Sequence, residues 1–380
     1  MLALLSINFV QIEKIAIFLL TLSILVVLHE LGHFILARRN GVRVNEFAVG
    51  FGPKLLKWTS PRSGTAYAIN LLPLGGYCAM KGEDGKSNEA EQQREFRTTN
   101  VHQYDEDNFQ GKTPWQRLAI VVAGPVANFI LAFAILLVSA VSFGIPDGKA
   151  QPVVGPMVSG MPADKAGIHV GDRVSAVNGA PVTNGTTLTD TIHNSLGKPL
   201  SLTLVRDGVS RTITLTPAPC PPQVKPAHMG CIGFSPINSY ARVGVGEAVS
   251  YAVFGMKGLY DQTVGSLVLL VSHPRQYGGS VSGIVGIGRA ATVVQDFGWG
   301  VYFQLAAVIS FSLGVFNLLP FPALDGGRGA FIVAELLRGK PVDPEKEAMV
   351  HIAGFAVLML LMIAVTYHDI ANIISGKGMF

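Results

Sequence analysis

The sequence predicts a membrane protein that is mainly α-helical, with four transmembrane helices, a membrane-associated β-hairpin and one extracytoplasmic β-rich domain. Of its 380 residues, 49% are hydrophobic and only 14% are charged, whereas a soluble globular domain carries about 25% charged residues. The uncharged residues are also grouped in stretches long enough to cross a bilayer as a helix, which takes about 20 residues. These observations exclude a wholly soluble enzyme, a disordered chain and a disulfide-rich secreted module.

Four stretches qualify as membrane spans. The first, residues 15–37, runs from an apolar segment directly into His29-Glu30-Leu31-Gly32-His33. A signal peptide would end in a small-residue cleavage site instead, so we interpret this stretch as an uncleaved span. The other three hold no Asp, Glu, Lys or Arg, and they are Leu118–Phe143, Val301–Leu324 and Met349–His368.

The basic residues predict the orientation of these spans, because Lys and Arg accumulate in cytoplasmic loops. Residues 38–117 hold 12 of them and 325–348 hold four, whereas each terminal tail holds one. We therefore expect these two segments in the cytoplasm and both termini outside a plasma (inner) membrane. The long segment 145–300 is then also outside, which is the periplasm in a Gram-negative cell.

The chain is expected to fall into eight segments. They are the first span at 1–37, a cytoplasmic membrane-associated β region and loop at 38–114, the second span at 115–144, an extracytoplasmic β-rich domain at 145–225, a linker with interfacial helices at 226–300, the third span at 301–324, a cytoplasmic segment at 325–348, and the fourth span with the C-terminal tail at 349–380.

The extracytoplasmic domain has clear strand and turn patterns. Leu200, Leu202 and Leu204 alternate with polar residues and are followed by Asp207-Gly208, which indicates a β-hairpin. Upstream, the run Gly160–Gly179 resembles the permuted bacterial type of PDZ domain. In that arrangement the peptide-binding strand is expected near Val153–Val158, with Val153, Val154 and Val158 as contact residues.

His29 and His33 are the strongest candidates for chemistry. Residues four apart lie on one face of a helix, so both imidazoles can bind one metal ion. Glu30 then projects beside that ion, where it can take a proton from a water molecule. Ionisable side chains within a span cost several kcal/mol and are rarely kept without a function.

A hydrolytic zinc site has three protein ligands, so two histidines need a third. Asp325 follows the two prolines of the segment Asn317–Leu324, at the same predicted membrane side as the histidines. On the residues alone, Asp325 is either that ligand or a turn residue before Gly326-Gly327. Asn128 in the second span is either a hydrogen-bond partner near this site or a packing residue.

Taken together, these motifs resemble the site-2 protease family of intramembrane zinc metalloproteases, in its RseP-like branch. The resemblance rests on HExxH in the first span, on the Asn317–Gly327 segment and on a single PDZ module between them. It implies one Zn²⁺ ion bound by His29, His33 and Asp325, with Glu30 as the catalytic acid/base. It also implies that three further residues hold substrate, namely Asn317, Pro320 and Pro322.

The expected function is therefore hydrolysis of peptide bonds in or near the transmembrane segment of single-span membrane proteins. The family suggests anti-sigma factors or signal-peptide remnants as substrates. The PDZ module either captures a peptide C-terminus or excludes intact ectodomains by size. The lipid bilayer is a further partner, and the net charge of +4 is too small and dispersed to indicate nucleic-acid binding.

Two other classes of protein share some of these features. A membrane scaffold with a structural metal would have no need of Glu30 at this spacing. A metal transporter would explain intramembrane His and Asp residues, but the chain lacks the repeat symmetry seen in many transporters.

Three cysteines are too few for a disulfide framework. Cys220 and Cys231 both lie on the oxidising side of the predicted topology, flanking a proline-rich loop, and can form a disulfide, whereas Cys78 faces the reducing cytoplasm.

Overall fold

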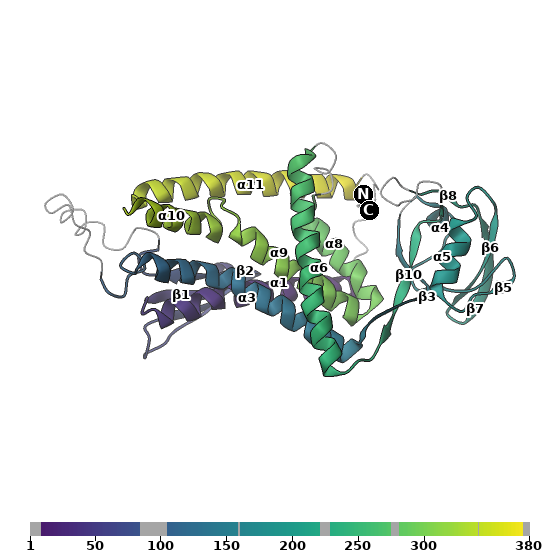
Figure 1. The fold of residues 1–380 in the computed structure, drawn as a ribbon, viewed down its shortest axis with the longest axis horizontal. Coiled ribbons are helices and arrows are strands. Elements are labelled where there is room, and N and C mark those ends of the chain that lie inside the picture. Colours follow the sequence, from purple (N-terminus) through teal and green to yellow (C-terminus); the bar gives the residue numbers. More distant parts are fainter. Residues whose placement is uncertain are drawn as a thin grey trace. The chain divides into compact units, whose positions relative to one another are not determined.

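The computed structural model of the chain describes residues 9–83, 105–158, 160–220, 229–274, 281–340 and 342–374 (Figure 1). Most of the loop expected within 38–114 lies outside these residues. The chain divides into two compact units. The first comprises Met1–Ile135, Gly255–Gly278 and Ala306–Ala364, and the second comprises Leu136–Phe254, Gly279–Leu305 and Val365–Phe380.

Four of the described helices are long and apolar enough to cross a membrane, which confirms the predicted number of spans. They are α1 (Phe9–Arg39), α3 (Pro114–Phe143), α9 (Trp299–Leu318) and α11 (Pro344–Ile374), the last of which spans over Lys346–Ala371. The protein is thus a multi-pass membrane protein of mainly helical structure, as the composition predicts.

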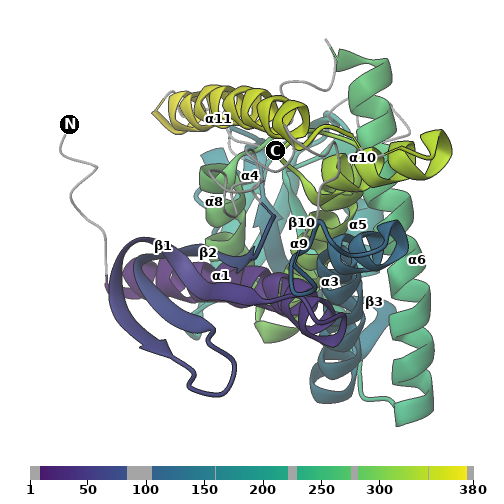
Figure 2. The same ribbon diagram turned by 90° about the vertical axis from the view of Figure 1, so that its left-hand side faces the viewer.

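In the first unit, β1 (Val44–Thr59) and β2 (Ala66–Met80) form a sheet that packs beside α1 (Figure 2). Both strands bend, so each supplies two arms to the sheet. The first arm of β1, Val44–Val49, pairs with Gly76–Met80 on one side and with Ala66–Ile69 on the other. The second arm of β1, Lys54–Thr59, pairs with Ala66–Asn70. The arm Gly76–Met80 therefore has a strand neighbour on one side only, among the described strands.

A compact apolar cluster joins this sheet to the helices of the first unit. It brings together the end of α1, the end of β2, the start of α3 and the helix α10 (Asp325–Arg338). Its fully buried members include Val44, Phe109 and Ile120. Burying one such side chain stabilises a fold by about 1.5–3 kcal/mol. The cluster therefore fixes the positions of these four segments relative to one another.

An ion pair adds to that cluster. The Arg117 guanidinium on α3 donates a 2.6 Å hydrogen bond to the Glu335 carboxylate on α10, and both side chains are largely buried. Breaking a buried pair costs about 3–5 kcal/mol because it leaves one charge uncompensated. The pair therefore holds α10 against the start of α3.

The second unit contains the PDZ-like domain. Its strands are β3 (Ile145–Met157), β4 (Arg173–Val177), β5 (Ala180–Pro181), β6 (Leu200–Arg206), β7 (Val209–Leu215) and β10 (Phe234–Ala241), and its helices are α4 (Pro162–Lys165) and α5 (Gly185–His193). The main sheet has the order β10-β3-β4-β6-β7, with β5 paired to β4. A small ladder joins β8 (Ala218–Pro219) to β9 (Gly230–Cys231).

The domain was predicted to end at residue 225, but its sheet extends further along the chain. The strand β10, which lies about 80 residues after β3 in the sequence, pairs with β3. The helix α5 packs on β3 and β10 (Figure 1). The predicted hairpin is present as β6 and β7, and the inward Leu200, Leu202 and Leu204 lie in the buried core of the domain.

After β10 the chain forms α6 (Val245–Ser272), α8 (Ile284–Val294) and a short 3₁₀ turn (Gln295–Phe297). The buried Asp369 carboxylate accepts hydrogen bonds of 2.9 Å from the backbone N–H groups of Gly283 and Gly286, and so caps α8. The N–H of Ile284 is not one of these donors.

The buried Asp172 ties the turn before β4 to β6. Both of its oxygens accept hydrogen bonds from the Arg206 guanidinium, at 2.6 and 2.7 Å, and one also accepts from the His169 backbone N–H at 2.8 Å. Burial acts to raise the pKa of Asp172, but these hydrogen bonds outweigh it, and the pKa is lowered from its ordinary value of 3.8.

We predict that Asp172→Asn destabilises the PDZ-like domain by about 1.5–3 kcal/mol, the contribution of hydrogen bonds to a charged group. Because the carboxyl has a lower pKa when folded, its stabilisation is complete above about pH 4 and is lost as the pH falls below that value. Amide hydrogen exchange of β4 and β6 in the full-length protein measures both effects. Asp190→Asn, at an exposed residue of α5, is the control, and equal losses in both variants would contradict the assignment.

Candidate metal centre

The helix α1 carries His29 and His33 on one face, as the spacing predicts. Both side chains are buried, and their Nε2 atoms lie 3.2 Å apart. They are within a stretch of α1 whose other residues are mostly apolar, so the two imidazoles are among the few polar groups at this depth.

Each imidazole is oriented by a hydrogen bond at its other nitrogen. The Nδ1–H of His33 donates to the Ile120 carbonyl on α3 at 2.8 Å. The Nδ1 of His29 lies 3.1 Å from the side-chain amide of Asn128, whose Oδ1 is buried without a partner in its present orientation. Turning this amide lets Oδ1 accept the Nδ1–H of His29, so that both Nε2 atoms are left unprotonated and face the same point.

Asp325 completes the group from α10. Its Oδ2 lies 3.1 Å from the Nε2 of His29 and 3.3 Å from the Nε2 of His33. Of the two sequence interpretations of Asp325, the one as a neighbour of the histidines agrees with this geometry. Asp325 is also the first residue of its helix, where a negative charge is favoured by the helix dipole.

The residues before and after Asp325 explain how it reaches this position. A Cβ at Gly326 would lie 2.3 Å from the Leu319 carbonyl oxygen, and one at Gly327 would lie 2.3 Å from that of Phe321. The first turn of α10 can therefore pack on the preceding bend only with glycine at both sites. Ala323 has φ of 77°, and its N–H donates to His351 Nδ1 at 2.9 Å, so His351 supports a strained turn.

The Nε2 atoms of His29 and His33 and the Oδ2 atom of Asp325 form a suitable cation site. With both Nδ1 atoms protonated, His29, His33 and Asp325 turn lone pairs toward one another at 3.1–3.3 Å. Tetrahedral zinc with metal–ligand distances of about 2.1 Å places its ligand atoms about 3.4 Å apart. The residues therefore fit zinc, and the fourth position is left for water or substrate.

Two glycines let the histidines approach α3. A Cβ at Gly124 would lie 2.2 Å from the Nε2 of His33 and 2.8 Å from the Cε1 of His29. A Cβ at Gly32 would lie 2.4 Å from the Ala123 carbonyl oxygen. The backbone of α3 thus forms the floor on which both imidazoles rest.

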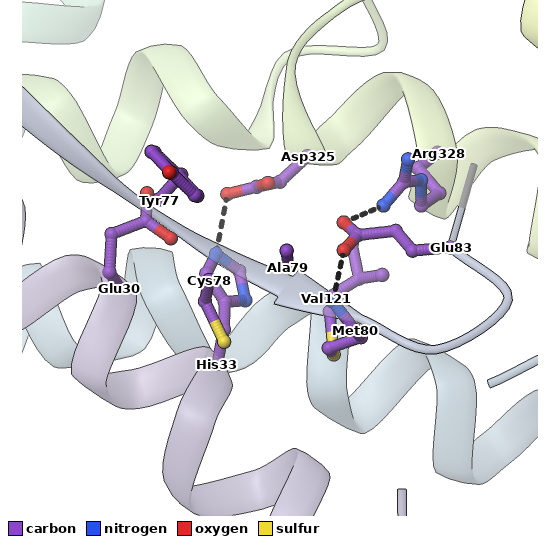
Figure 3. Close-up of a pocket in the computed structure, with 10 residues that line it drawn as sticks. All are labelled: Glu30, His33, Tyr77, Cys78, Ala79, Met80, Glu83, Val121, Asp325 and Arg328. Carbon is purple, nitrogen blue, oxygen red and sulfur yellow. Dashed lines mark hydrogen bonds and ion pairs between the residues drawn. The ribbon is translucent and has the colours of Figure 1, made fainter. Parts of the chain in front are cut away.

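A cavity of about 450 Å³ opens beside these ligand atoms. Glu30 points into it from α1 and Asp325 from α10, and the arm Gly76–Met80 of β2 crosses it (Figure 3). The Cγ of Glu30 lies 3.7 Å from the position of a Cβ at Gly76. The side chain of Glu30 is consequently near both the histidines and the arm Gly76–Met80.

Arg328 and Glu83 also line this cavity, and the sequence analysis did not single them out. Arg328 lies one turn after Asp325 on α10 and donates to the Glu83 carboxylate, which in turn accepts the Met80 backbone N–H at 3.0 Å. The pair therefore joins α10 to the end of β2 (Figure 3). In the sequence, this ion pair is indicated only by the spacing of Asp325 and Arg328, which places both side chains on one face at the start of a helix.

The residues expected to hold substrate are placed differently. None of Asn317, Pro320 and Pro322 lines this cavity. Asn317 lies near the end of α9, and Pro322 packs against Gly354 of α11, where a Cβ would lie 2.4 Å from the proline Cβ. The two prolines thus shape the bend before Asp325.

Val153 and Val154, which were expected to contact a peptide, lie on β3, and Val158 follows that strand. The strand β3 pairs with β10 on one side, and on the other side Val153 pairs with Arg173 of β4. Val154 is fully buried in the domain core, and the N–H of Val158 donates to the Gly233 carbonyl at 2.7 Å. The edge strand beside α5 is β10 instead.

The fold and the site together are typical of a membrane metallopeptidase: four candidate spans among the described residues, a His-Glu-x-x-His helix, and a carboxylate from a distant helix that forms a candidate metal site with the two histidines. Residues 17–361 match the model of peptidase family M50, and the chain belongs to that family. It is a zinc metalloprotease, which sets aside the scaffold and transporter alternatives.

Relatives support this over almost the whole length. The chain is 32% identical to the zinc metalloprotease RasP of Bacillus licheniformis, over 94% of this chain and 98% of the relative. It is equally similar to RasP of Geobacillus kaustophilus, at 32% over 94% and 98%. The regulator of sigma-W protease RasP of Bacillus subtilis is 31% identical, over 95% and 99%.

We predict that Gly124→Ala removes most of the bound zinc, because the new methyl group would displace both imidazoles. Zinc content of the purified protein, measured by elemental analysis, checks this. Gly329→Ala is the matched control, since a Cβ there would meet only Leu118 and Val121 at 3.7 and 3.9 Å. Full zinc occupancy in Gly124→Ala would contradict the packing argument.

Proposed function

We propose that the protein hydrolyses peptide bonds in or near the transmembrane segment of single-span membrane proteins, as a step of regulated intramembrane proteolysis. The observation that supports this most is that Asp325 of α10 meets His29 and His33 on α1, a helix that also carries Glu30 and is long and apolar enough to span a bilayer. The name of the Bacillus subtilis relative connects that protein to a sigma factor. Anti-sigma factors and signal-peptide remnants are therefore the substrates we propose to test first.

His29, His33 and Asp325 are the proposed zinc ligands. The chemistry that zinc supplies when bound is polarisation of the scissile carbonyl and a lower pKa for water. Asn128 and the Ile120 carbonyl hold the two imidazoles in the tautomer that leaves Nε2 free for the metal.

Glu30 is the proposed catalytic acid/base. Its carboxylate points into the cavity from the residue after His29, as Figure 3 shows. From there it takes the proton of the attacking water and later passes it to the leaving amine. One carboxylate performs both transfers, because the proton that it accepts in the first step is the one that it donates in the second.

The substrate must unwind before it can be cut. A transmembrane helix hides its carbonyl groups in hydrogen bonds, and an unwound segment needs new backbone partners at that depth. The arm Gly76–Met80 lines the cavity and has one unpaired side among the described strands. We propose that the substrate adds to this arm as a further strand.

For the PDZ-like domain, the proposed peptide site lies along β10, the edge strand beside α5. Capture of a peptide C-terminus and exclusion of intact ectodomains both remain compatible with this placement. We further propose the orientation derived from the basic residues, with both termini and this domain outside and with 38–114 and 325–348 in the cytoplasm.

Glu30→Gln should lower cleavage of a single-span substrate in detergent by at least about 10²–10⁴-fold, the usual contribution of a general acid/base. Zinc content should stay at the wild-type level, because Glu30 is not one of the three ligands. Turnover is followed by gel separation of the clipped fragment. Cleavage by Glu30→Gln at a rate near that of the wild type would refute the role of Glu30.

Ala79→Pro should slow cleavage strongly while zinc stays bound, because proline removes a ladder hydrogen bond between the arm Gly76–Met80 and β1 and so displaces the arm to which the substrate would add. Leu56→Pro is the control, since Leu56 lies on the opposite arm of the same sheet and is 60% exposed. Initial rates and zinc content of both variants are compared with the wild type. Unchanged turnover in Ala79→Pro, or an equal loss in Leu56→Pro, would count against the arm.

A further inference from the structure

A second group of metal-ligating side chains lies in the PDZ-like domain. His193 is the last residue of α5, Cys220 follows β8, and Cys231 is the last residue of β9. One ligand atom from each lies within 4.8 Å of the other two. In the structure the two cysteines form a disulfide, with their Cα atoms 4.9 Å apart.

The arrangement of these residues does not depend on the disulfide alone. The β8–β9 ladder pairs Ala218 with Cys231, and the Cys220 N–H donates to the Met229 carbonyl at 3.2 Å. The ladder and this hydrogen bond hold the two segments that carry the cysteines side by side when the sulfurs are not bonded.

The helix α5 is held to this ladder independently. A Cβ at Gly230 would lie 2.8 Å from the Ile192 carbonyl oxygen and 2.9 Å from the Leu196 nitrogen, so β9 packs directly on the helix backbone. The Gly197 N–H also donates to the Pro217 carbonyl at 3.1 Å. His193 therefore stays beside the two cysteines in either redox state.

We propose that reduction of this disulfide creates a binding site for one Zn²⁺ ion, with two thiolates and the imidazole of His193 as ligands. A dithiol reductant supplies two electrons and two protons, the S–S bond breaks, and the dithiol becomes a disulfide. Zinc binding then releases the two thiol protons. In oxidised protein the same sulfurs are bonded to each other and offer no thiolate.

The distances are suitable for this ion. Zinc–sulfur bonds of about 2.3 Å and zinc–nitrogen bonds of about 2.1 Å place tetrahedral ligand atoms about 3.5–3.8 Å apart. The three ligand atoms already lie within 4.8 Å of one another, so rotation of the cysteine side chains is enough to open the site. His193 is in the last turn of α5, where the helix dipole favours a cation.

The site is separate from the proposed catalytic one, which has no sulfur ligand. In oxidised protein the disulfide joins the residue after β8 to β9, and His193 at the end of α5 has no part in that bond. A bound ion would also tie His193 to Cys231, three residues before β10 begins at Phe234. Only the metal-bound state would therefore link α5 to the segment that leads into β10.

The test is a Co²⁺ titration of the full-length, zinc-loaded protein in detergent, before and after reduction with a phosphine that is removed without air. Thiolate–cobalt charge transfer absorbs in the near ultraviolet, and His and Asp ligands do not produce it. We expect this absorption, saturating at one equivalent, in reduced protein and not in oxidised protein. Its absence from reduced protein would overturn the proposal, whether or not hydrogen exchange shows α5 still protected.

Variants assign the ligands. His193→Ala should weaken Co²⁺ binding to reduced protein by at least about tenfold, whereas His169→Ala, an exposed histidine of the same domain, should leave it unchanged. Cys78→Ser should keep the absorption, because Cys78 lies in the catalytic cavity. An unchanged affinity in His193→Ala, or loss of the absorption in Cys78→Ser, would overturn the assignment.

Discussion

The metal centre depends on the close approach of α1 and α3. Gly32 and Gly124 bring the two helix backbones together where any larger residue would collide, and the imidazoles of His29 and His33 rest directly on α3. Only at this separation can Ile120 accept the hydrogen bond of His33 and Asn128 reach His29. Packing thus decides the orientation of the ring nitrogens before any metal is bound, and a preorganised site loses less entropy when it binds its ion.

Asp325, the proposed third ligand, follows a strained turn that neighbouring side chains stabilise. Ala323 adopts a φ of 77°, which a residue with a side chain rarely accepts and which costs about 1–3 kcal/mol. His351 from α11 accepts the Ala323 N–H, and Gly326 and Gly327 let the first turn of α10 pack on the preceding bend. The Pro-x-Pro bend and the two glycines therefore act together to place the Asp325 side chain beside the histidines.

The sequence predicted well what depends on local geometry. The spans follow from length and apolar composition, and the pairing of His29 with His33 follows from the helix period. The place of Asp325 depends on contacts between residues some 290 positions apart, so the residues alone left it as a ligand or a turn residue. The pairing of β3 with β10 was likewise not predicted, because β10 lies about 80 residues further along the chain.

The need of every backbone group at membrane depth for a hydrogen-bond partner explains why a sheet lies beside the candidate metal centre. An extended substrate at membrane depth must exchange its helical hydrogen bonds for others at once, because lipid offers none. A strand with one unpaired side provides them in register along the substrate, and the arm Gly76–Met80 is such a strand. Glu83 accepts the Met80 N–H and pairs with Arg328, one turn after Asp325. The strand that would hold the substrate is thereby fixed to α10, the helix that carries a proposed zinc ligand. The substrate and the proposed catalytic groups would therefore keep constant positions relative to one another.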